Sequence, residues 1–362
     1  MPDKLFHLYR TTLKVEDIRR KKLNRTFEKV KISVNSNPEI EMYIKIRGNS
    51  TLGFSKKNFY LKSVNKFHFK DEFKTKKLFL LSLVNDEFGF KMEYSFRLLG
   101  EMGMSFSHRQ FAIVYINNKL QGLYLAMERP EDAIKRKVKG AVSVFRATKS
   151  QYRGFYSCYK TPGVNALETI RYFNSIHDET DHNLQAEKYR IIIDLDMYMK
   201  WLVLNSLLEN GDSVDELYIY EVRKDSDKKG ILKLFPWDYD GIQSNPAHPA
   251  KTHKDPLLWA AERKLDYEII NNPVLYNQLK NIMSSMLKNH LTKEYLSKIL
   301  LGLEMELNSI DVGNSKNEIA DIEQQRMLAI QKFRKRLFLR HDELLGLVRH
   351  RNLGSEEPVT VQ

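Results

Sequence analysis

The sequence predicts an α+β protein with a strand-rich first part and a helix-rich second part. In segments 27–34 and 40–47 apolar and polar residues alternate, and β-branched and aromatic side chains are frequent, as in half-buried strands. From about residue 164 onward the apolar residues recur at helical spacing instead. A chain of 362 residues is long enough for one large or two ordinary domains. We expect a strand-rich lobe at 1–130, a helical lobe at 131–351 and a loose tail at 352–362.

The first lobe contains further signals of a small antiparallel sheet. Segment 58–62 has strand composition, and segment 90–101 has the spacing of a helix. In 111–128 two apolar runs flank Asn117-Asn118, which is typical of a tight β-hairpin because Asn tolerates the positive φ that such turns require. We therefore expect strands, one helix and a hairpin in this lobe.

The second lobe is predicted to be helical with one hairpin inserted. Segments 164–176 and 189–209 have helical spacing, and a strand pair at 216–222 and 231–237 separates them from later helices. The last helix carries a mostly apolar stripe from Ile322 to Val348: Ile322, Arg326, Ala329, Phe333, Leu337, His341, Leu344 and Val348. A cleft between two lobes of this kind is a common place for a ligand.

Composition indicates a soluble globular protein. Apolar residues make up 42% of the chain and charged residues 29%, which is not the balance of a disordered protein. The single cysteine, Cys158, excludes an intrachain disulfide and a cysteine-based zinc cluster. The first ten residues lack an apolar signal-peptide region, and the longest apolar run, 78–84, is too short to span a bilayer. We expect a reducing, intracellular compartment and no membrane partner.

The net charge of +13 favours polyanionic partners, namely nucleic acid, phosphorylated molecules or acidic protein surfaces. Part of this excess lies in 331–341, where Arg334, Lys335 and Arg336 are adjacent, and the simplest interpretation is a solvated helix face. No base-stacking motif accompanies the charge, so nucleic acid is the least favoured of these partners.

Two groups of acidic residues flank the second hairpin. Before and after it the acidic residues are Glu209, Asp212, Asp215, Glu216, Asp238 and Asp240. In an antiparallel pair the start of one strand lies beside the end of the other, about 4.8 Å away. Carboxylates brought together in this way need protons or cations, and oxygen ligands without His or Cys favour Mg²⁺ or Mn²⁺ bound to a nucleotide. The alternative for any single acid is an ordinary turn residue.

Segment 46–62 is a weaker candidate for phosphate binding. A strand ends at Arg47, the turn Gly48–Thr51 follows, and Lys56 and Lys57 lead into the next strand. The turn can present backbone N–H and hydroxyl groups to phosphate, and the basic side chains supply charge. A polar hairpin turn without a ligand explains the same pattern.

Four motifs together resemble the CotH family of spore-coat protein kinases. They are "RGNST" with "KKNFYLK", then "VYINNKLQGLYLAME", then "ENGDS" with "LYIY", and finally "LFPWDYDG", in this order along the chain. The resemblance extends over roughly residues 40–345.

The resemblance implies an atypical, protein-kinase-like fold with two lobes. It implies transfer of the γ-phosphate of ATP, with Mg²⁺ or Mn²⁺, to Ser or Thr of Ser-rich spore-coat proteins, in the mother-cell cytoplasm or the spore coat. In kinases the catalytic Asp precedes a hairpin and the metal-binding Asp follows it. By that analogy Asp212 is the catalytic carboxylate that receives the substrate hydroxyl proton, with Asp215 as its rival. Asp238 is then the principal metal ligand, and Asp240 and Glu216 are further ligands.

The resemblance also assigns residues to the nucleotide. Lys57, or its neighbour Lys56, is expected to contact the phosphates, with Glu93 as the acidic partner of that lysine. Glu128 is expected where the two lobes connect. The other residues assigned to the nucleotide are Arg47, Ser50 and Trp237.

The sequence departs from the family pattern near the hairpin. Family members usually carry Asn five residues after the catalytic Asp, whereas position 217 is Leu here and the nearest carboxylate is Glu216. The first-lobe helix has Lys91-Met92 where the family often has Arg-Asn. Two alternatives are a catalytically weak or inactive coat scaffold and a nucleotide-sugar transferase that holds its metal with Asp-x-Asp. The transferase requires an early βαβ unit, and the first lobe is predicted to be antiparallel.

Overall fold

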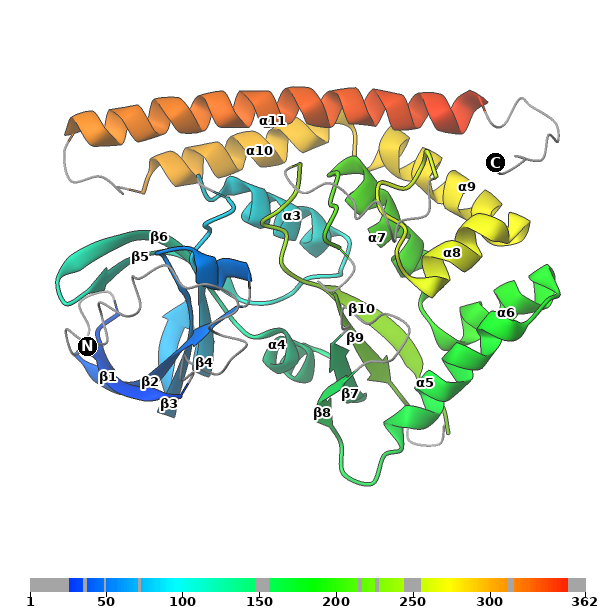
Figure 1. The fold of residues 1–362 in the computed structure, drawn as a ribbon, viewed down its shortest axis with the longest axis horizontal. Helices are drawn as coiled ribbons and strands as arrows, with labels where there is room; N and C mark the ends of the chain where they lie inside the picture. Colours follow the sequence, from blue (N-terminus) through cyan, green and yellow to red (C-terminus); the bar gives the residue numbers. More distant parts are fainter. Residues whose placement is uncertain are drawn as a thin grey trace.

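The computed structural model describes most of the chain. The described residues are 26–34, 38–48, 50–70, 73–86, 88–146, 156–213, 217–224, 228–243, 255–310 and 316–350. They form a six-stranded sheet, a four-stranded sheet and a group of helices that covers one side of the molecule (Figure 1). The predicted α+β class, with a strand-rich first part and a helix-rich second part, is confirmed.

The six-stranded sheet is antiparallel, in the order β1-β2-β3-β4-β6-β5. Its strands are β1 (Glu28–Ile32), β2 (Ile40–Arg47), β3 (Asn58–Lys70), β4 (Phe73–Leu81), β5 (Arg109–Ile116) and β6 (Lys119–Met127), with a short 3-10 turn η1 (Ser50–Gly53). On β2 the side chains of Met42, Ile44 and Ile46 are buried, as the period of two predicts. The sheet curls around these apolar side chains and so forms a small core of its own.

The turn between β5 and β6 has the predicted geometry. Asn117 and Asn118 both have positive φ, at 51° and 58°. Two successive residues with positive φ are what a type I′ turn requires, and Asn accepts this conformation more readily than most residues. The hairpin prediction is confirmed, as is the helix α3 (Phe90–Glu101). The sequence did not indicate β4, and it predicted only the first part of β3.

The four-stranded sheet has the order β10-β9-β7-β8. Its strands are β7 (Ala141–Arg146), β8 (Tyr156–Lys160), β9 (Leu217–Val222) and β10 (Ile231–Pro236). The predicted hairpin is β9–β10, with Leu217 opposite Pro236 and Val222 opposite Ile231. Strands β7 and β8 were not predicted. The helix α4 (Pro130–Lys137) lies between the two sheets (Figure 1).

The remaining helices belong to the second lobe. They are α5 (Ala166–Ser175), the 3-10 turn η2 (Ile176–Asp178), α6 (His182–Ile192), α7 (Leu195–Leu207), α8 (Lys264–Asn271), α9 (Pro273–Asn289), α10 (Lys293–Asn308) and α11 (Lys316–His350). The segment predicted as one helix over 189–209 is two helices. Ile193 forms a β-bridge with Leu232, and the carboxylate of Asp194 caps α7 by accepting from the Met197 N–H at 3.2 Å. This cap starts a new helix in a new direction. No helix within the described ranges is both long and apolar enough to cross a membrane.

The long helix α11 spans the helical side of the molecule, next to α10 and above α3 (Figure 1). Its predicted stripe is confirmed, since Phe333, Leu337 and Leu344 are buried. The Phe333 ring lies edge-on to Phe90 at 5.3 Å and to Tyr94 at 5.5 Å, measured between ring centroids. Helix α11 therefore holds α3, which belongs to the first part of the chain, against the helices of the second.

We predict that Phe333→Ala destabilises the protein by about 3–5 kcal/mol, because it leaves a cavity between α3 and α11. The matched control is Leu339→Ala on the same helix, where the side chain is 63% exposed. The control should change the free energy of unfolding by less than about 0.5 kcal/mol. Urea unfolding followed by circular dichroism measures both, and equal losses in the two variants would contradict the packing role of α11.

Candidate active site

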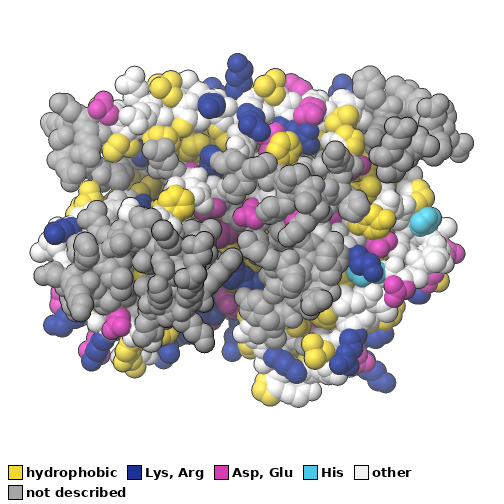
Figure 2. Space-filling model, viewed as in Figure 1, with side chains coloured by type: hydrophobic (Ala, Val, Ile, Leu, Met, Phe, Trp, Pro, Cys, Tyr) yellow, Lys and Arg dark blue, Asp and Glu magenta, His cyan; other side chains and the backbone are white. Residues whose placement is uncertain are grey.

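The acidic loops on either side of the β9–β10 hairpin meet in space, as predicted. The register places Leu217 opposite Pro236, so the loop before β9 and the loop after β10 leave the sheet at the same end. The Gln243 N–H donates to the Glu209 carbonyl oxygen at 3.3 Å and joins the two loops directly. In the space-filling view, acidic side chains are visible in the middle of the face, between the β1–β6 part and the helices (Figure 2).

The carboxylate of Asp240 lies at the centre of a strongly negative region. The pKa of Asp240 is raised from 3.8 to about 8, mainly by burial and then by the charge of Asp238, with smaller contributions from Asp86 and Asp212. One of its oxygens accepts from Asn85 Nδ2 at 3.0 Å. The charges of three other carboxylates thus act on Asp240, and a bound cation would relieve this repulsion.

Asp86 belongs to this region although the sequence did not indicate it. It precedes α3 and is 1% exposed. One carboxylate oxygen accepts from the Met92 N–H at 3.0 Å, whereas its Oδ1 has no hydrogen-bond partner among the described residues. Burial raises the pKa of Asp86 to about 6. The available sequence signal was an acidic residue just before a helix, which ordinarily indicates only a helix start.

Lys91 supplies positive charge to the same region from the first turn of α3. Burial lowers the pKa of Lys91, and the carboxylates of Asp86 and Asp240 oppose that shift. The family that the sequence resembles often has Arg at this position of the helix. Lys91 therefore keeps a positively charged side chain there.

Asp238 follows β10 with a φ of 64°, in the left-handed region that most residues avoid. Such conformations persist where the surroundings hold them, and they are frequent at functional sites. The guanidinium of Arg47, at the end of β2, lies close enough for Asp238 to oppose the lowering of the Arg47 pKa by burial. The structure therefore brings the predicted metal ligand and a predicted phosphate-binding residue together.

Trp237 is buried where the two sheets meet, with 1% of its surface exposed. Its ring lies edge-on to Phe79 of β4 at 5.6 Å. The Arg47 guanidinium lies 3.9 Å from the Phe79 ring centroid and 5.5 Å from that of Trp237. Trp237 thus supports Arg47 from the second lobe. Its assignment to the nucleotide remains a prediction.

The two lysines predicted to meet phosphate contact backbone carbonyls. Lys57 Nζ donates to the Leu52 carbonyl oxygen at 2.9 Å and to that of Phe54. Lys56 Nζ donates to the Leu123 carbonyl oxygen at 2.5 Å, and burial lowers its pKa to about 8. Ser50 begins the 3-10 turn that precedes them. A phosphate contact by any of these residues remains a prediction.

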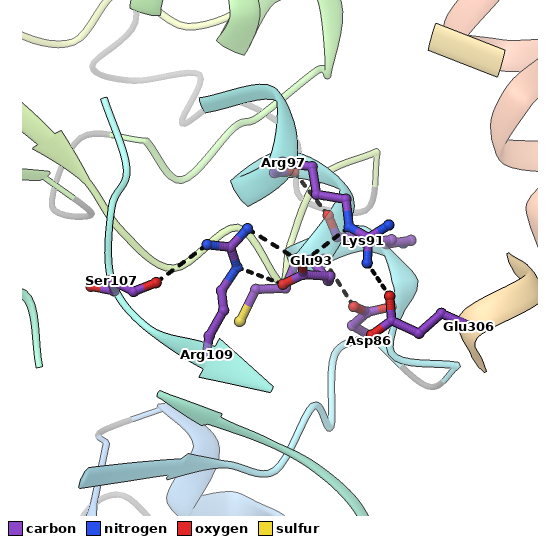
Figure 3. Close-up of polar contacts among 9 residues, drawn as sticks. Asp86, Lys91, Glu93, Arg97, Ser107, Arg109 and Glu306 are labelled. Carbon is purple, nitrogen blue, oxygen red and sulfur yellow. Dashed lines mark hydrogen bonds and ion pairs between the residues drawn. The ribbon is translucent and has the colours of Figure 1, made fainter. Parts of the chain in front are cut away.

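Glu93 pairs with arginines, where a pair with Lys57 was predicted (Figure 3). Its carboxylate accepts from Arg109 Nε at 2.6 Å and from Arg97 Nε at 3.1 Å. Arg97 also pairs with Glu306 of α10. Glu93 therefore ties α3 to β5 and, through Arg97, to α10.

Glu128 lies at the predicted connection between the lobes, directly after β6 and before α4. Its carboxylate accepts from Arg136 Nη2 at 2.7 Å and from the His108 N–H at 3.2 Å. These contacts fix the point at which the chain passes from the first sheet to the second. The predicted contact with a nucleotide stays a prediction.

Asp212 lies in the loop after α7, and its N–H donates to Asn210 Oδ1 at 3.2 Å. Its rival Asp215 and the predicted metal ligand Glu216 lie outside the described residues. Leu217, at the position of the usual family Asn, is fully buried as the first residue of β9. The side chain at 217 therefore belongs to the core.

The described residues fit a divalent cation that is completed by phosphate. Within the described part of the chain, no group of three His, Cys, Asp or Glu side chains could hold a metal ion alone. Mg²⁺ is often held by only one or two carboxylates together with phosphate oxygens and water. Asp238 and Asp240 provide hard oxygen ligands of this kind, and the raised pKa of Asp240 indicates negative charge that a cation would balance.

The chain is similar to known proteins of one family. The family model described as CotH kinase protein matches residues 44–335. The chain belongs to the CotH family. It is also similar to inner spore coat protein H of Bacillus subtilis (strain 168), with 20% identity over 281 residues, 73% of this chain and 76% of that protein. The resemblance seen in the sequence motifs is confirmed.

We predict that Asp240→Asn stabilises the metal-free protein at pH 8.5. The carboxyl of Asp240 has a pKa of about 8 in the folded protein, compared with the ordinary value of 3.8. Because the folded state disfavours its ionisation, the free energy of unfolding falls as the pH rises from 3.8 to about 8, and this loss is complete above pH 8. In EDTA the variant should melt higher than the wild type at pH 8.5, by about 2 °C or more. At pH 5 the difference should be smaller.

The matched control for this measurement is Asp321→Asn, an exposed acid on α11. It should melt within about 1 °C of the wild type at both pH values, since exposed substitutions change stability little. A variant at Asp240 that melts lower than the wild type at pH 8.5 would show that the carboxylate stabilises the metal-free fold.

Proposed function

We propose that this CotH-family chain is an ATP-dependent Ser/Thr protein kinase that acts on spore-coat proteins. The observation that carries the proposal is the grouping of Asp212, Asp238 and Asp240 beside the partly buried Arg47, where the two sheets meet. The description of the family as CotH kinase protein supports the reaction. The name of the similar Bacillus subtilis protein supports a place in the spore coat.

Phosphoryl transfer requires an acceptor for the hydroxyl proton, ligands for the metal and cations for the phosphates. In this proposal the substrate hydroxyl oxygen forms a bond to the γ-phosphorus, the bond to the β–γ bridging oxygen breaks, and ADP leaves. Asp212 accepts the hydroxyl proton. Asp238 and Asp240 hold Mg²⁺ or Mn²⁺, which when bound neutralises the charge of the phosphate oxygens.

Arg47 is the cation best placed for the phosphates, because it lies within electrostatic reach of Asp238. Its guanidinium lies near the ring of Phe79 on β4 and the ring of Trp237 after β10, so both lobes hold it. Lys56 and Lys57 stay candidates for the same role. To reach a phosphate, either amine would exchange its carbonyl contacts for the stronger contact with an anion.

A second candidate is a coat scaffold with weak or absent catalysis. The specific observation in its favour is Leu217, which is buried in β9 at the position of the usual Asn ligand. The nucleotide-sugar transferase is not supported, because all strand pairs of the first sheet are antiparallel and no early βαβ unit occurs within the described residues. Thermal stabilisation by ATP with Mg²⁺, measured beside phosphate transfer, separates an active kinase from a scaffold.

We predict that the wild type transfers labelled phosphate from ATP to a Ser-rich coat protein and that Asp238→Asn loses most of this activity. The substitution removes the charge that the metal requires while keeping the size of the side chain. We expect a loss of about a hundredfold or more, with little change in ATP binding when Mg²⁺ is absent. Transfer at the wild-type rate by Asp238→Asn would reject this site.

For Asp212→Asn we predict retained binding of ATP and Mg²⁺ with transfer reduced by about a hundredfold, the lower end for loss of a general base. The comparison variant is Asp215→Asn, which should retain more activity. Isothermal titration and single-turnover transfer measure the two quantities separately. The reverse order of activities would assign the catalytic role to Asp215. Nucleotide binding by an inactive wild type would identify a pseudokinase.

A further inference from the structure

The two acidic loops of the candidate site are both attached to one turn of α11. The carboxylate of Glu209 forms an ion pair with Arg336. From the other loop, Gln243 Nε2 donates to the Phe333 carbonyl oxygen at 3.4 Å, one turn earlier on the same helix. These contacts cross about 90 to 130 positions of sequence. They attach α11 to the loops that carry the candidate catalytic residues.

Glu209 stands in a conformation that requires support. Its φ is 50°, in the left-handed region, and its side chain is 8% exposed. A residue other than Gly is strained in this conformation, which persists only where neighbouring contacts impose it. Those contacts are the Arg336 guanidinium on the side chain and the Gln243 N–H on the carbonyl oxygen.

Two hydrogen bonds hold the turn between Glu209 and Asp212. The N–H of Asn210 donates to the Asn205 carbonyl oxygen of α7 at 2.9 Å, and Asn210 Oδ1 accepts from the Asp212 N–H at 3.2 Å. The turn is therefore held at its start by α11 and at its centre by α7. A displacement of Glu209 would be passed to Asp212 through Asn210.

The same ion pair balances the charge of a buried carboxylate. Glu209 lies three positions before Asp212 in the loop after α7, and its side chain is 8% exposed. Its partner Arg336 is half-exposed. Loss of Arg336 would leave a buried carboxylate without its partner, which is strongly unfavourable. The loop would be expected to move to expose it.

We propose that Glu209 and Arg336 are positioning residues, and that their ion pair sets the placement of Asp212 relative to Asp238 and Asp240. Neither residue need touch ATP or the substrate hydroxyl. The kinetic part of this inference rests on the proposed kinase function. The positional part concerns the loops alone and can be measured without any activity.

Arg336→Gln tests the proposal, with Arg334→Gln as the matched control. Arg334 lies two positions away on α11, on an exposed face of the helix. In Arg336→Gln we expect kcat to fall by about tenfold or more while KM for ATP changes by less than about twofold, because a misplaced catalytic group slows the chemical step. Arg336→Lys should recover much of kcat, since it keeps the charge. The control should match the wild type.

Amide hydrogen exchange provides the readout that is independent of activity. In Arg336→Gln, peptides covering 209–213 and 238–243 should exchange faster than in the wild type by about fivefold or more, which corresponds to about 1 kcal/mol of lost local stability. Arg334→Gln should leave both peptides unchanged. The variant Glu209→Gln removes the same ion pair from the other side and should give the same pattern.

A double-mutant cycle completes the test. If the two residues act through one ion pair, Glu209→Gln with Arg336→Gln should lower kcat little more than either change alone. Independent, additive losses would overturn the proposal, and so would exchange and kcat values for Arg336→Gln equal to those of Arg334→Gln. If the wild type transfers no phosphate, the proposed kinase function fails, and the exchange of the two peptides alone decides the positioning role.

Discussion

The rest of the structure depends on the negative charge that is concentrated between the two sheets. The charges of Asp86, Asp212 and Asp238 act on the partly buried carboxylate of Asp240, whose pKa is raised to about 8. Such a region is unfavourable without a counter-charge, and a bound cation would supply one. Two partly buried basic residues of the first lobe, Arg47 at the end of β2 and Lys91 in α3, lie within electrostatic reach of these carboxylates.

Local patterns in the sequence were sufficient to predict the central part of this arrangement. The β9–β10 hairpin could be recognised from composition, and antiparallel pairing then required its flanking acids to meet. The Asn117-Asn118 turn, α3 and the apolar stripe of α11 were predictable for the same reason, since each is a periodicity or a turn signal within a short window.

The remainder depends on contacts between distant segments, which no local pattern specifies. Asp86 precedes a helix and looks like an ordinary helix start, yet the fold places it near the acids that follow β10. Glu93 was expected beside a lysine and pairs instead with Arg97 and Arg109. Strands β7 and β8 gave no recognisable pattern in the sequence. Strand β7 pairs with β9, from a distant part of the chain, and β8 pairs with β7, so this order of strands could not be predicted.

The attachment of both acidic loops to α11 also affects the order of events during synthesis. The segments that carry Asp212 and Asp240 leave the ribosome roughly a hundred residues before the turn of α11 that holds them. At ordinary elongation rates of about 5–20 residues per second, that interval is on the order of 10 s. A nascent chain in this interval has its acidic residues but lacks the helix that orients them. The fold thereby delays assembly of the site until nearly all of the second lobe is made.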